Sequence, residues 1–232
     1  MPGSGPDGGT EPGPGTGAAP FVDVLVGGVG PAAAAAAASK ALSAASGSAP
    51  YDLVVSAGIG GGFAERAPVG SLVVADAVVA ADLGADSPGG FLPVDELGFG
   101  RTVHLPPAAL AARAAGLAGA VHAPVLTVST VTGTAARAAE LRARHPRAAA
   151  EAMEGFGVAE AAALHGVPVL EIRAVSNPVG PRDRAAWRIG DALTALSTAF
   201  RLLGPLLAAE ADPPPAPRRE TGPAPLAEES SP

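Results

Sequence analysis

The stretch Asp52-Leu-Val-Val-Ser-Ala57, followed at once by Gly58-Ile-Gly-Gly-Gly62, decides the fold class of this chain. A short, continuous apolar run is typical of a parallel strand that is covered on both faces. We predict that residues 52–57 form such a strand and that the glycines end it. Glycine lets backbone N–H groups approach a ligand closely. A flexible turn without a ligand is the alternative interpretation of these glycines.

Outward from this strand, apolar runs and helical patterns largely alternate along the chain. Such alternation is typical of α/β proteins. We therefore predict an α/β three-layer sandwich around a central mixed, mostly parallel sheet. Further strands are predicted at 21–26, 71–75, 77–81, 124–129 and 168–175, helices at 32–46, 107–117, 134–144, 154–165 and 184–207, and a long glycine-rich loop at 82–100.

The two ends of the chain differ in composition from its middle. Residues 1–20 consist mainly of glycine, proline and other small residues, and residues 209–232 are rich in proline and glutamate. Neither segment can bury enough apolar surface to offset the entropy lost on ordering, so we predict that both are disordered. The remaining residues, 21–208, have the length of one domain.

Charge and cysteine content exclude several classes of function. The formal net charge of −7 gives no basic surface for nucleic acid or for an anionic membrane. The chain has no cysteine, which removes disulfides and thiolate chemistry, and its four histidines have no spacing typical of a metal site. We expect a cytoplasmic protein without metal, without a nucleic-acid partner and without a membrane partner.

A second glycine motif follows the first predicted strand. Gly28-Val-Gly-Pro-Ala-Ala33 resembles the G-x-G-x-x-A of dinucleotide-binding proteins. Such a site also needs an acidic residue at the end of the next strand, and Ser56-Ala57 stands there instead. We interpret the motif as a tight turn between strand and helix and expect no cofactor.

Glu154 and Asn177 are the polar residues that carry most information. Glu154 lies between Met153 and Gly155 at the start of a predicted helix, and Asn177 follows the predicted strand 168–175. Ligands of α/β sheets bind at the carboxyl ends of strands. A carboxylate can accept hydrogen bonds from two vicinal hydroxyls, and an amide can both donate and accept. The pair therefore suits a ligand made of a sugar and a base.

Each of these residues also has a purely structural interpretation. A carboxylate at a helix start is favoured by the helix dipole, and Asn before Pro commonly opens a turn. In Ser129-Thr-Val-Thr-Gly-Thr134, Thr132 or Thr134 can cap the next helix, with ligand contact from Thr130 or Thr132 as an addition. Glu171 and Arg173 are expected to pair with each other or with a neighbour, since burial without pairing is costly.

Several motifs resemble the purine nucleoside phosphorylase and nucleosidase superfamily. They are Val69–Asp76 after the glycines, Met153-Glu154-Gly155, and Arg173-Ala-Val-Ser-Asn177. Within it, Thr130–Thr134, Glu151–Gly157 and Ser176–Trp187 look most like the futalosine hydrolase family. The resemblance runs from about Phe21 to Leu207.

The resemblance implies hydrolysis of the N-glycosidic bond of futalosine, a 6-oxopurine nucleoside, releasing hypoxanthine in the alternative menaquinone pathway. Glu154 would hold the ribose 2′- and 3′-hydroxyls, and Asn177 would meet the base where adenine-specific relatives carry Asp. Relatives are usually homo-oligomers. The alternatives are a methylthioadenosine or adenosylhomocysteine type of nucleosidase, a phosphorylase, or a catalytically impaired ligand-binding relative. The implied substrate-binding residues are Gly58, Gly60, Gly61, Thr130, Thr132, Met153, Glu154, Phe156 and Asn177.

The chain departs from the family pattern at its start. The segment Phe21–Val26 matches a later strand of the family, the one before the Gly-x-Gly turn. The preceding strand, and the glutamate after it that orients the attacking water, have no counterpart here. We therefore expect a nucleosidase domain at 21–208 without its usual first strand.

Overall fold

The computed structural model describes residues 21–210 except 46 and 48, so the predicted disorder of residues 1–20 and of most of 209–232 lies outside the described residues. The main sheet consists of β1 (Val54–Gly62), β2 (Leu72–Ala80), β5 (Val103–His104), β6 (Val121–Thr127), β7 (Ala150–Ala152) and β8 (Val169–Pro178). Their order is β5-β2-β6-β7-β1-β8, and β2 also pairs with β8, so the sheet closes on itself. Its two longest pairings, β1–β8 and β2–β6, are parallel.

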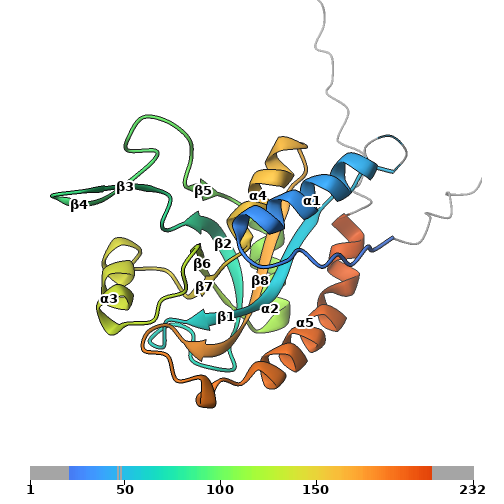
Figure 1. Cartoon of the computed structure of the whole chain (residues 1–232). Coiled ribbons are helices and arrows are strands. Elements are labelled where there is room, and N and C mark those ends of the chain that lie inside the picture. The colour runs from blue at the N-terminus through green and yellow to red at the C-terminus, as the bar shows by residue number, and fades with distance from the viewer. Residues whose placement is uncertain (1–20, 46, 48, 211–232) are drawn as a thin grey trace, which may run out of the picture.

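Helices cover both faces of this sheet (Figure 1). The helices of the described part are α1 (Pro31–Ala45), α2 (Ala108–Ala118), α3 (Ala135–Arg144), α4 (Gly155–Leu164), the 3₁₀ turn η1 (Arg184–Ala186) and α5 (Ile189–Glu210). Helices α1 and α4 contact each other in one layer, and α2 and α5 contact each other in the other layer. The predicted three-layer α/β architecture with a mixed sheet is therefore confirmed.

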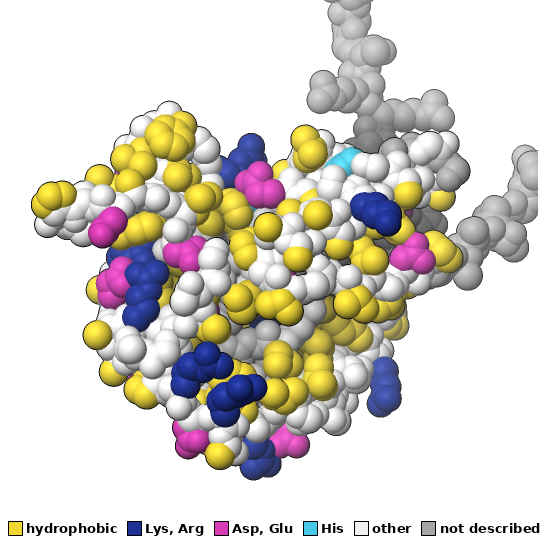
Figure 2. Space-filling view, viewed as in Figure 1, with side chains coloured by type: hydrophobic (Ala, Val, Ile, Leu, Met, Phe, Trp, Pro, Cys, Tyr) yellow, Lys and Arg dark blue, Asp and Glu magenta, His cyan; other side chains and the backbone are white. Residues whose placement is uncertain are grey.

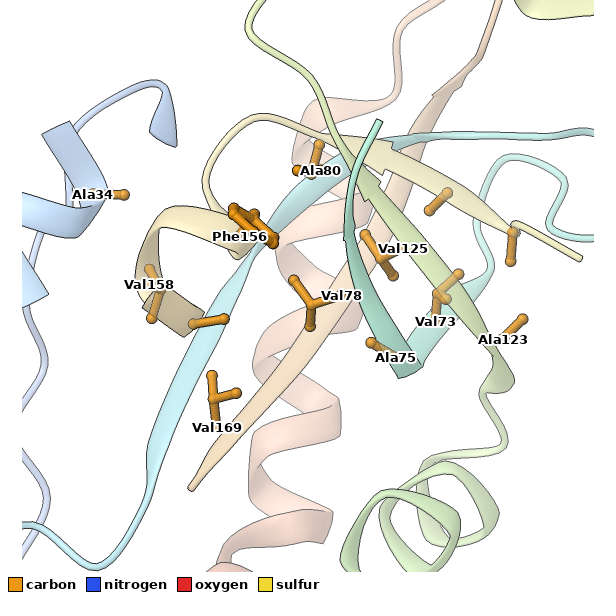
Figure 3. Close-up of a cluster of buried hydrophobic side chains, with 14 of the residues drawn as sticks. Ala34, Val73, Ala75, Val78, Ala80, Ala123, Val125, Phe156, Val158 and Val169 are labelled. Carbon is orange, nitrogen blue, oxygen red and sulfur yellow. The ribbon is translucent and has the colours of Figure 1, made fainter. Parts of the chain in front are cut away.

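Small side chains fill the core between the sheet and its helices. In the cluster of Figure 3, Phe156 and Val158 of α4 pack with Val78 and Val169 of the sheet and with Ala34 of α1. A second cluster joins α2 and α5 to the opposite face of the sheet. Burying each valine stabilises the fold by about 1.5–3 kcal/mol, and the alanines let the layers approach closely.

The glycine run belongs to strand β1, so the prediction that it ends the strand is wrong. Its glycines are needed because neighbouring groups come very close. A Cβ atom on Gly58 would lie 2.5 Å from Arg173 Nη1, and one on Gly60 would lie 2.7 Å from the carbonyl oxygen of Glu151. The glycine run is therefore part of a strand, and its missing side chains leave space for Arg173 and for the Glu151 carbonyl. Neither of the two interpretations of these glycines from the sequence predicted this arrangement.

Residues 21–26 form no strand, contrary to prediction. They have no regular secondary structure and lie on the surface, with Val24 93% exposed and Val26 89% exposed. Their apolar, β-branched composition favours a strand, but no described strand lies beside them to supply backbone hydrogen bonds.

Three further boundaries differ from prediction. The two strands predicted at 71–75 and 77–81 form one strand, β2, whose register with β6 shifts between Ala75 and Val78. The predicted loop 82–100 contains the hairpin β3 (Gly84–Ser87) and β4 (Gly90–Pro93), in which the Ser87 hydroxyl donates to the Gly90 carbonyl. Helix α5 begins at Ile189 and extends to Glu210, whereas the predicted helix spans 184–207.

Helix α5 is both long and apolar. The segment Arg184–Ala209 is long and apolar enough to cross a bilayer by length and composition, a test that core helices also pass. Here Leu203 and Leu206 are buried in the cluster shared with α2, which gives the helix a core role. Even so, only 22% of its most apolar window is buried.

Gly157 of α4 provides a test of the close packing between α4 and α1. A Cβ atom there would lie 2.0 Å from the Pro31 carbonyl oxygen, which is backbone and cannot easily move. We expect Gly157→Ala to lower the free energy of unfolding by about 1–3 kcal/mol or more. Urea unfolding followed by circular dichroism measures this change.

Gly116 of α2 is the matched control, because a Cβ atom there meets nothing within 4 Å. Gly116→Ala should raise the free energy of unfolding by about 0.4–1 kcal/mol, since alanine has less backbone freedom in the unfolded chain. Equal effects of the two substitutions would contradict the packing described between α4 and Pro31.

Candidate active site

Glu154 lies at the junction of β7 and α4, where the short strand ends and the helix begins. It occupies the N-cap position of α4, but its side chain makes no capping hydrogen bond. Instead, Oε1 accepts a hydrogen bond from the Gly30 N–H at 3.4 Å, and Oε2 accepts one from Arg173 Nη1 at 3.1 Å. The carboxylate is therefore held by groups outside its own helix, and the interpretation as a simple helix-start acid is insufficient.

Arg173 is the group that holds Glu154 in place. Its side chain projects from β8, is 2% exposed, and donates through all three of its nitrogens. Nη1 binds Glu154, Nη2 donates to the Ser56 hydroxyl at 3.1 Å, and Nε donates to Glu171 Oε1 at 2.8 Å. The predicted pairing of Glu171 with Arg173 is confirmed, and the guanidinium also links both to the site.

Glu171 is fully buried beneath the start of α4. A Cβ atom on Gly155 would lie 2.2 Å from Glu171 Oε1, so only glycine fits at that helix position. Burial raises the pKa of Glu171, nearby Glu154 raises it further, and Arg173 opposes both. Glu171 Oε2 has no hydrogen-bond partner among the described residues, as expected for a carboxyl that binds a proton readily.

Asn177 lies near the carboxyl end of β8, beside the glycine strand. Its Oδ1 accepts from the Ser176 hydroxyl at 2.8 Å, and its Nδ2 donates to the Pro178 carbonyl at 3.0 Å. Gly61 pairs with Asn177 in the ladder, and a Cβ atom on Gly61 would crowd Nδ2 at 3.3 Å. Glycine at 61 therefore leaves the amide room.

One cavity of about 1190 Å³ brings most of the predicted site residues together. Glu154, Asn177 and Arg173 line it, with Ser56 and Ser176 beside them. Trp187 also lines it. The predicted residues on its lining are Gly58, Gly60, Gly61, Thr132, Met153, Glu154 and Asn177.

The threonine loop is attached to the site through Glu151, a buried residue of β7. Thr132 donates its hydroxyl to Glu151 Oε2 and its backbone N–H to Oε1, the latter at 2.8 Å. Burial raises the pKa of Glu151, although both hydrogen bonds from Thr132 oppose this effect. Thr134 caps α3 by accepting from the Arg137 N–H, which confirms the predicted cap.

Two residues of the predicted substrate set lie away from the cavity lining. Thr130 is exposed on the loop after β6. Phe156 is 7% exposed and packs in the core, where its ring lies 5.1 Å from the ring of His104. Substrate contact by these two side chains stays a prediction that this arrangement does not favour.

Two residues of the site were not predicted as site residues from the sequence. Arg173 was given another role, and Ser56 was not considered as a site residue. Arg173 was expected only to pair with Glu171 or with a neighbour, whereas it also contacts the sugar-site candidate Glu154 directly. The available signal was an arginine inside an otherwise apolar strand, since buried charge is normally paired. Ser56 carries no comparable signal, because serine is common in strands and turns.

Comparison with known protein families identifies the class of protein. The family model of the phosphorylase superfamily matches residues 18–204, so the chain belongs to that superfamily. A futalosine hydrolase of Streptomyces coelicolor is 71% identical over 186 residues, which are 80% of this chain and 79% of that protein. A futalosine hydrolase of Thermus thermophilus is 36% identical, over 72% of this chain and 75% of that protein. Within the superfamily, the chain is a member of the futalosine hydrolase family.

Solved structures show the same fold. A methylthioadenosine/adenosylhomocysteine nucleosidase from Colwellia psychrerythraea, in complex with adenine, matches with a TM-score of 0.64 and 25% identity over 80% of this chain and 76% of that one. A futalosine hydrolase of Helicobacter pylori matches with a TM-score of 0.66 and 17% identity, covering 78% of this chain and 77% of that one. The latter likeness concerns the fold alone.

The raised pKa of Glu171 predicts a pH-dependent stability. The folded chain binds this proton more tightly than the unfolded chain, so the contribution of Glu171 is largest at low pH and is lost as pH rises through its folded pKa. Glu171→Gln keeps the shape and removes the titration. We expect its stability relative to wild type to increase between about pH 5 and about pH 8 in urea unfolding.

Gly116→Ala changes no titratable group, so it is the control and should leave the pH dependence of unfolding unchanged. A stability difference between wild type and Glu171→Gln that stays constant over this pH range would contradict the role assigned to burial.

Proposed function

We propose that this chain hydrolyses the N-glycosidic bond of futalosine and releases hypoxanthine, as a step of the alternative menaquinone pathway. The supporting observation is the convergence of the Glu154 carboxylate and the Asn177 amide on one cavity, in a chain 71% identical to a futalosine hydrolase. The relatives' names supply the substrate, and the geometry supplies a role for each group.

At the sugar end, Glu154 accepts hydrogen bonds from the ribose 2′- and 3′-hydroxyls with its two oxygens. Cleavage of the C–N bond passes through an oxocarbenium-like sugar, as in glycoside hydrolysis. A carboxylate held in position stabilises that positive charge without reorganising during the reaction. Arg173 orients Glu154, because it donates to Oε2 from a buried position.

At the base end, Asn177 distinguishes a 6-oxopurine from adenine. Its amide donates to one acceptor of the purine and accepts from a ring N–H, a combination that hypoxanthine presents. To do so it exchanges its present hydrogen bonds with Ser176 and Pro178 for bonds to the base. The absence of a carboxylate at 177 removes the group that would favour protonation of adenine.

The reaction consumes one water molecule. The bond between C1′ of the sugar and N9 of the purine breaks with both electrons on the base, which leaves as hypoxanthine after gaining a proton. The water oxygen forms a bond with C1′, and its remaining hydrogen gives the anomeric hydroxyl of the sugar product. No metal ion or organic cofactor is required by this balance.

We further propose that the protein is cytoplasmic and homo-oligomeric, and that it binds neither a membrane nor nucleic acid. Apolar side chains are exposed on the hairpin β3–β4 and on the segment that follows it, as expected for a surface that a second copy covers. Members of that group are Leu83, Leu92, Leu97, Phe99, Val103 and Leu105.

Substitution of Glu154 tests the sugar-binding role. Glu154→Ala should lower kcat/KM for futalosine by about 30- to 1,000-fold, because loss of a preorganised electrostatic group costs about 2–4 kcal/mol of transition-state stabilisation. Release of hypoxanthine, followed by chromatography, measures the rate. Near wild-type turnover would refute the assignment.

Glu65→Ala removes an exposed glutamate that does not line the cavity and lies outside the apolar surface proposed for a second copy, so it should leave kcat/KM unchanged. If the wild-type chain binds futalosine tightly but releases no hypoxanthine, the protein is a ligand-binding relative and not a hydrolase.

Substitution of Asn177 tests base recognition. Asn177→Asp should shift preference toward adenine nucleosides, since a carboxyl group can protonate the leaving base while an amide cannot. The measurement is the ratio of kcat/KM for futalosine to that for methylthioadenosine. An unchanged ratio would show that residue 177 does not contact the base.

A further inference from the structure

One proton of the proposed hydrolysis has no source among the groups discussed so far. The purine gains a proton as it leaves the sugar. Asn177 cannot supply that proton, because an amide donates a hydrogen bond without releasing its hydrogen. Glu154 accepts hydrogen bonds from the ribose in the same reaction. The proton must therefore come from another acid that can reach the base.

The acidic side chains of the cavity lining differ in where they lie along β1. Those on the lining are Asp23, Asp52, Glu151 and Glu154. Asp52 precedes β1 and Asp23 binds the neighbouring Tyr51, so both lie at the far end of β1 from its last glycines. Glu171, although fully buried, does not line the cavity. Glu151 is the acid that remains at the end of β1 where Asn177 lies.

Glu151 and Asn177 lie on the two sides of Gly61. In the sheet, Gly61 of β1 pairs with Glu151 of β7 on one edge and with Asn177 of β8 on the other. Neighbouring strands are ~4.8 Å apart, so the backbones of the two residues are roughly 10 Å apart in one row of the sheet. Gly61 places no side chain between them. A flat base over Gly61 can therefore face Asn177 with one edge and the β7 side with the other.

Glu151 is a buried carboxyl without an ion pair to any described residue. It is 3% exposed, and its oxygens accept from Thr132, Oε1 from the backbone N–H at 2.8 Å and Oε2 from the hydroxyl. Hydrophobic side chains gather on the face between α1 and α5, where the cavity lies (Figure 2). Burial raises the pKa of Glu151 most and Asp82 also raises it, whereas Thr132 and the charge of Arg137 lower it. Glu151 therefore keeps a proton at higher pH than an ordinary glutamate does.

Thr132 links this carboxyl to the cavity. Its side chain is 7% exposed and lies on the cavity lining. A hydroxyl donates and accepts at once, and its hydrogen turns to suit its partners. When Glu151 carries a proton, the same contact lets the carboxyl O–H donate to Thr132 Oγ1. The Thr132 hydrogen is then available to a ligand in the cavity.

We propose, on the basis of the hydrolysis proposed above, that Glu151 supplies the proton of the leaving purine through the hydroxyl of Thr132. As the bond between C1′ and N9 breaks, its electron pair moves onto the base, and a ring nitrogen takes the Thr132 hydrogen. The Glu151 proton moves to Thr132 Oγ1, which leaves Glu151 as a carboxylate. The water that binds C1′ loses one proton, and this proton restores Glu151. Thr132 touches the base, and Glu151 acts through it.

The pH dependence of hypoxanthine release in a single turnover of futalosine tests this role, between about pH 5 and about pH 9. A proton donor works only while it is protonated, so the wild-type rate should fall as pH rises through the pKa of Glu151 in the complex. Glu151→Gln keeps the shape but has no proton to release, so this fall should disappear. At low pH its rate should be at least ~100-fold below wild type, with the dissociation constant of futalosine changed by less than ~3-fold.

Substitutions of Thr132 separate proton transfer from packing. Thr132→Ser keeps the hydroxyl and should stay within ~3-fold of the wild-type rate, whereas Thr132→Val removes the hydroxyl at similar shape and should match Glu151→Gln in rate and pH profile. The double variant should be no slower than either single variant, because the two groups act as one unit. Glu65→Gln, exposed and outside the cavity lining, is the control and should change neither rate nor profile.

Two results would overturn the role of Glu151 while leaving the hydrolysis intact. One is a Glu151→Gln chain that keeps the wild-type rate or keeps the wild-type fall with pH. The other is a Thr132→Val chain with the wild-type rate, which decides the question even if Glu151→Gln fails to fold, since Glu151 itself is then unchanged. Circular dichroism checks the folding of each variant. A wild-type chain that releases no hypoxanthine would overturn the hydrolysis and this role together.

Discussion

The rest of this structure depends on the hydrogen bonds and ion pairs that the buried guanidinium of Arg173 makes. It lies in the layer of the sheet, and its nitrogens donate to Glu154, Glu171 and Ser56. A cation removed from water is tolerated only when it is paired and fully hydrogen-bonded. Three segments, β1, β8 and the start of α4, must therefore meet with correct geometry before the charge is satisfied. Because Arg173 binds Glu154, the same pairing also positions the Glu154 carboxylate at the cavity.

Glycine makes this arrangement possible. Gly58 gives space to the Arg173 head group and Gly155 gives space to Glu171, each where any side chain would collide. The glycines near the site therefore contribute because they have no side chain, which leaves space for neighbouring groups. This differs from the familiar role of glycine in loops that bind phosphate, and it explains why the run Gly58–Gly62 is found inside a strand.

The sequence predicted the layers, most helices and two residues, Glu154 and Asn177, that line the cavity, because these depend on local pattern. Alternating apolar runs indicate strands, and Thr134 before an alanine-rich run indicates a helix start. It did not predict β7, a strand of three residues whose partners lie elsewhere in the chain. Nor did it predict that Phe21–Val26 stays outside the sheet, since local composition cannot show whether a partner strand is in reach. Arg173 was assigned a structural role for the same reason: its contact with Glu154 joins residues distant in sequence.

The alanine-rich core described above has a further consequence for how this chain tolerates variation. Alanine has no side-chain rotamer freedom, so burying it costs no side-chain entropy. Truncating such a core removes little volume, while enlarging it meets neighbours at once, as at Ala34, Ala159 and Ala162. The alanine positions of the core can therefore change in one direction only, toward larger side chains that displace their neighbours. Sequence drift in this protein should accumulate on its surface and loops, and these alanine positions should stay restricted to the smallest side chains.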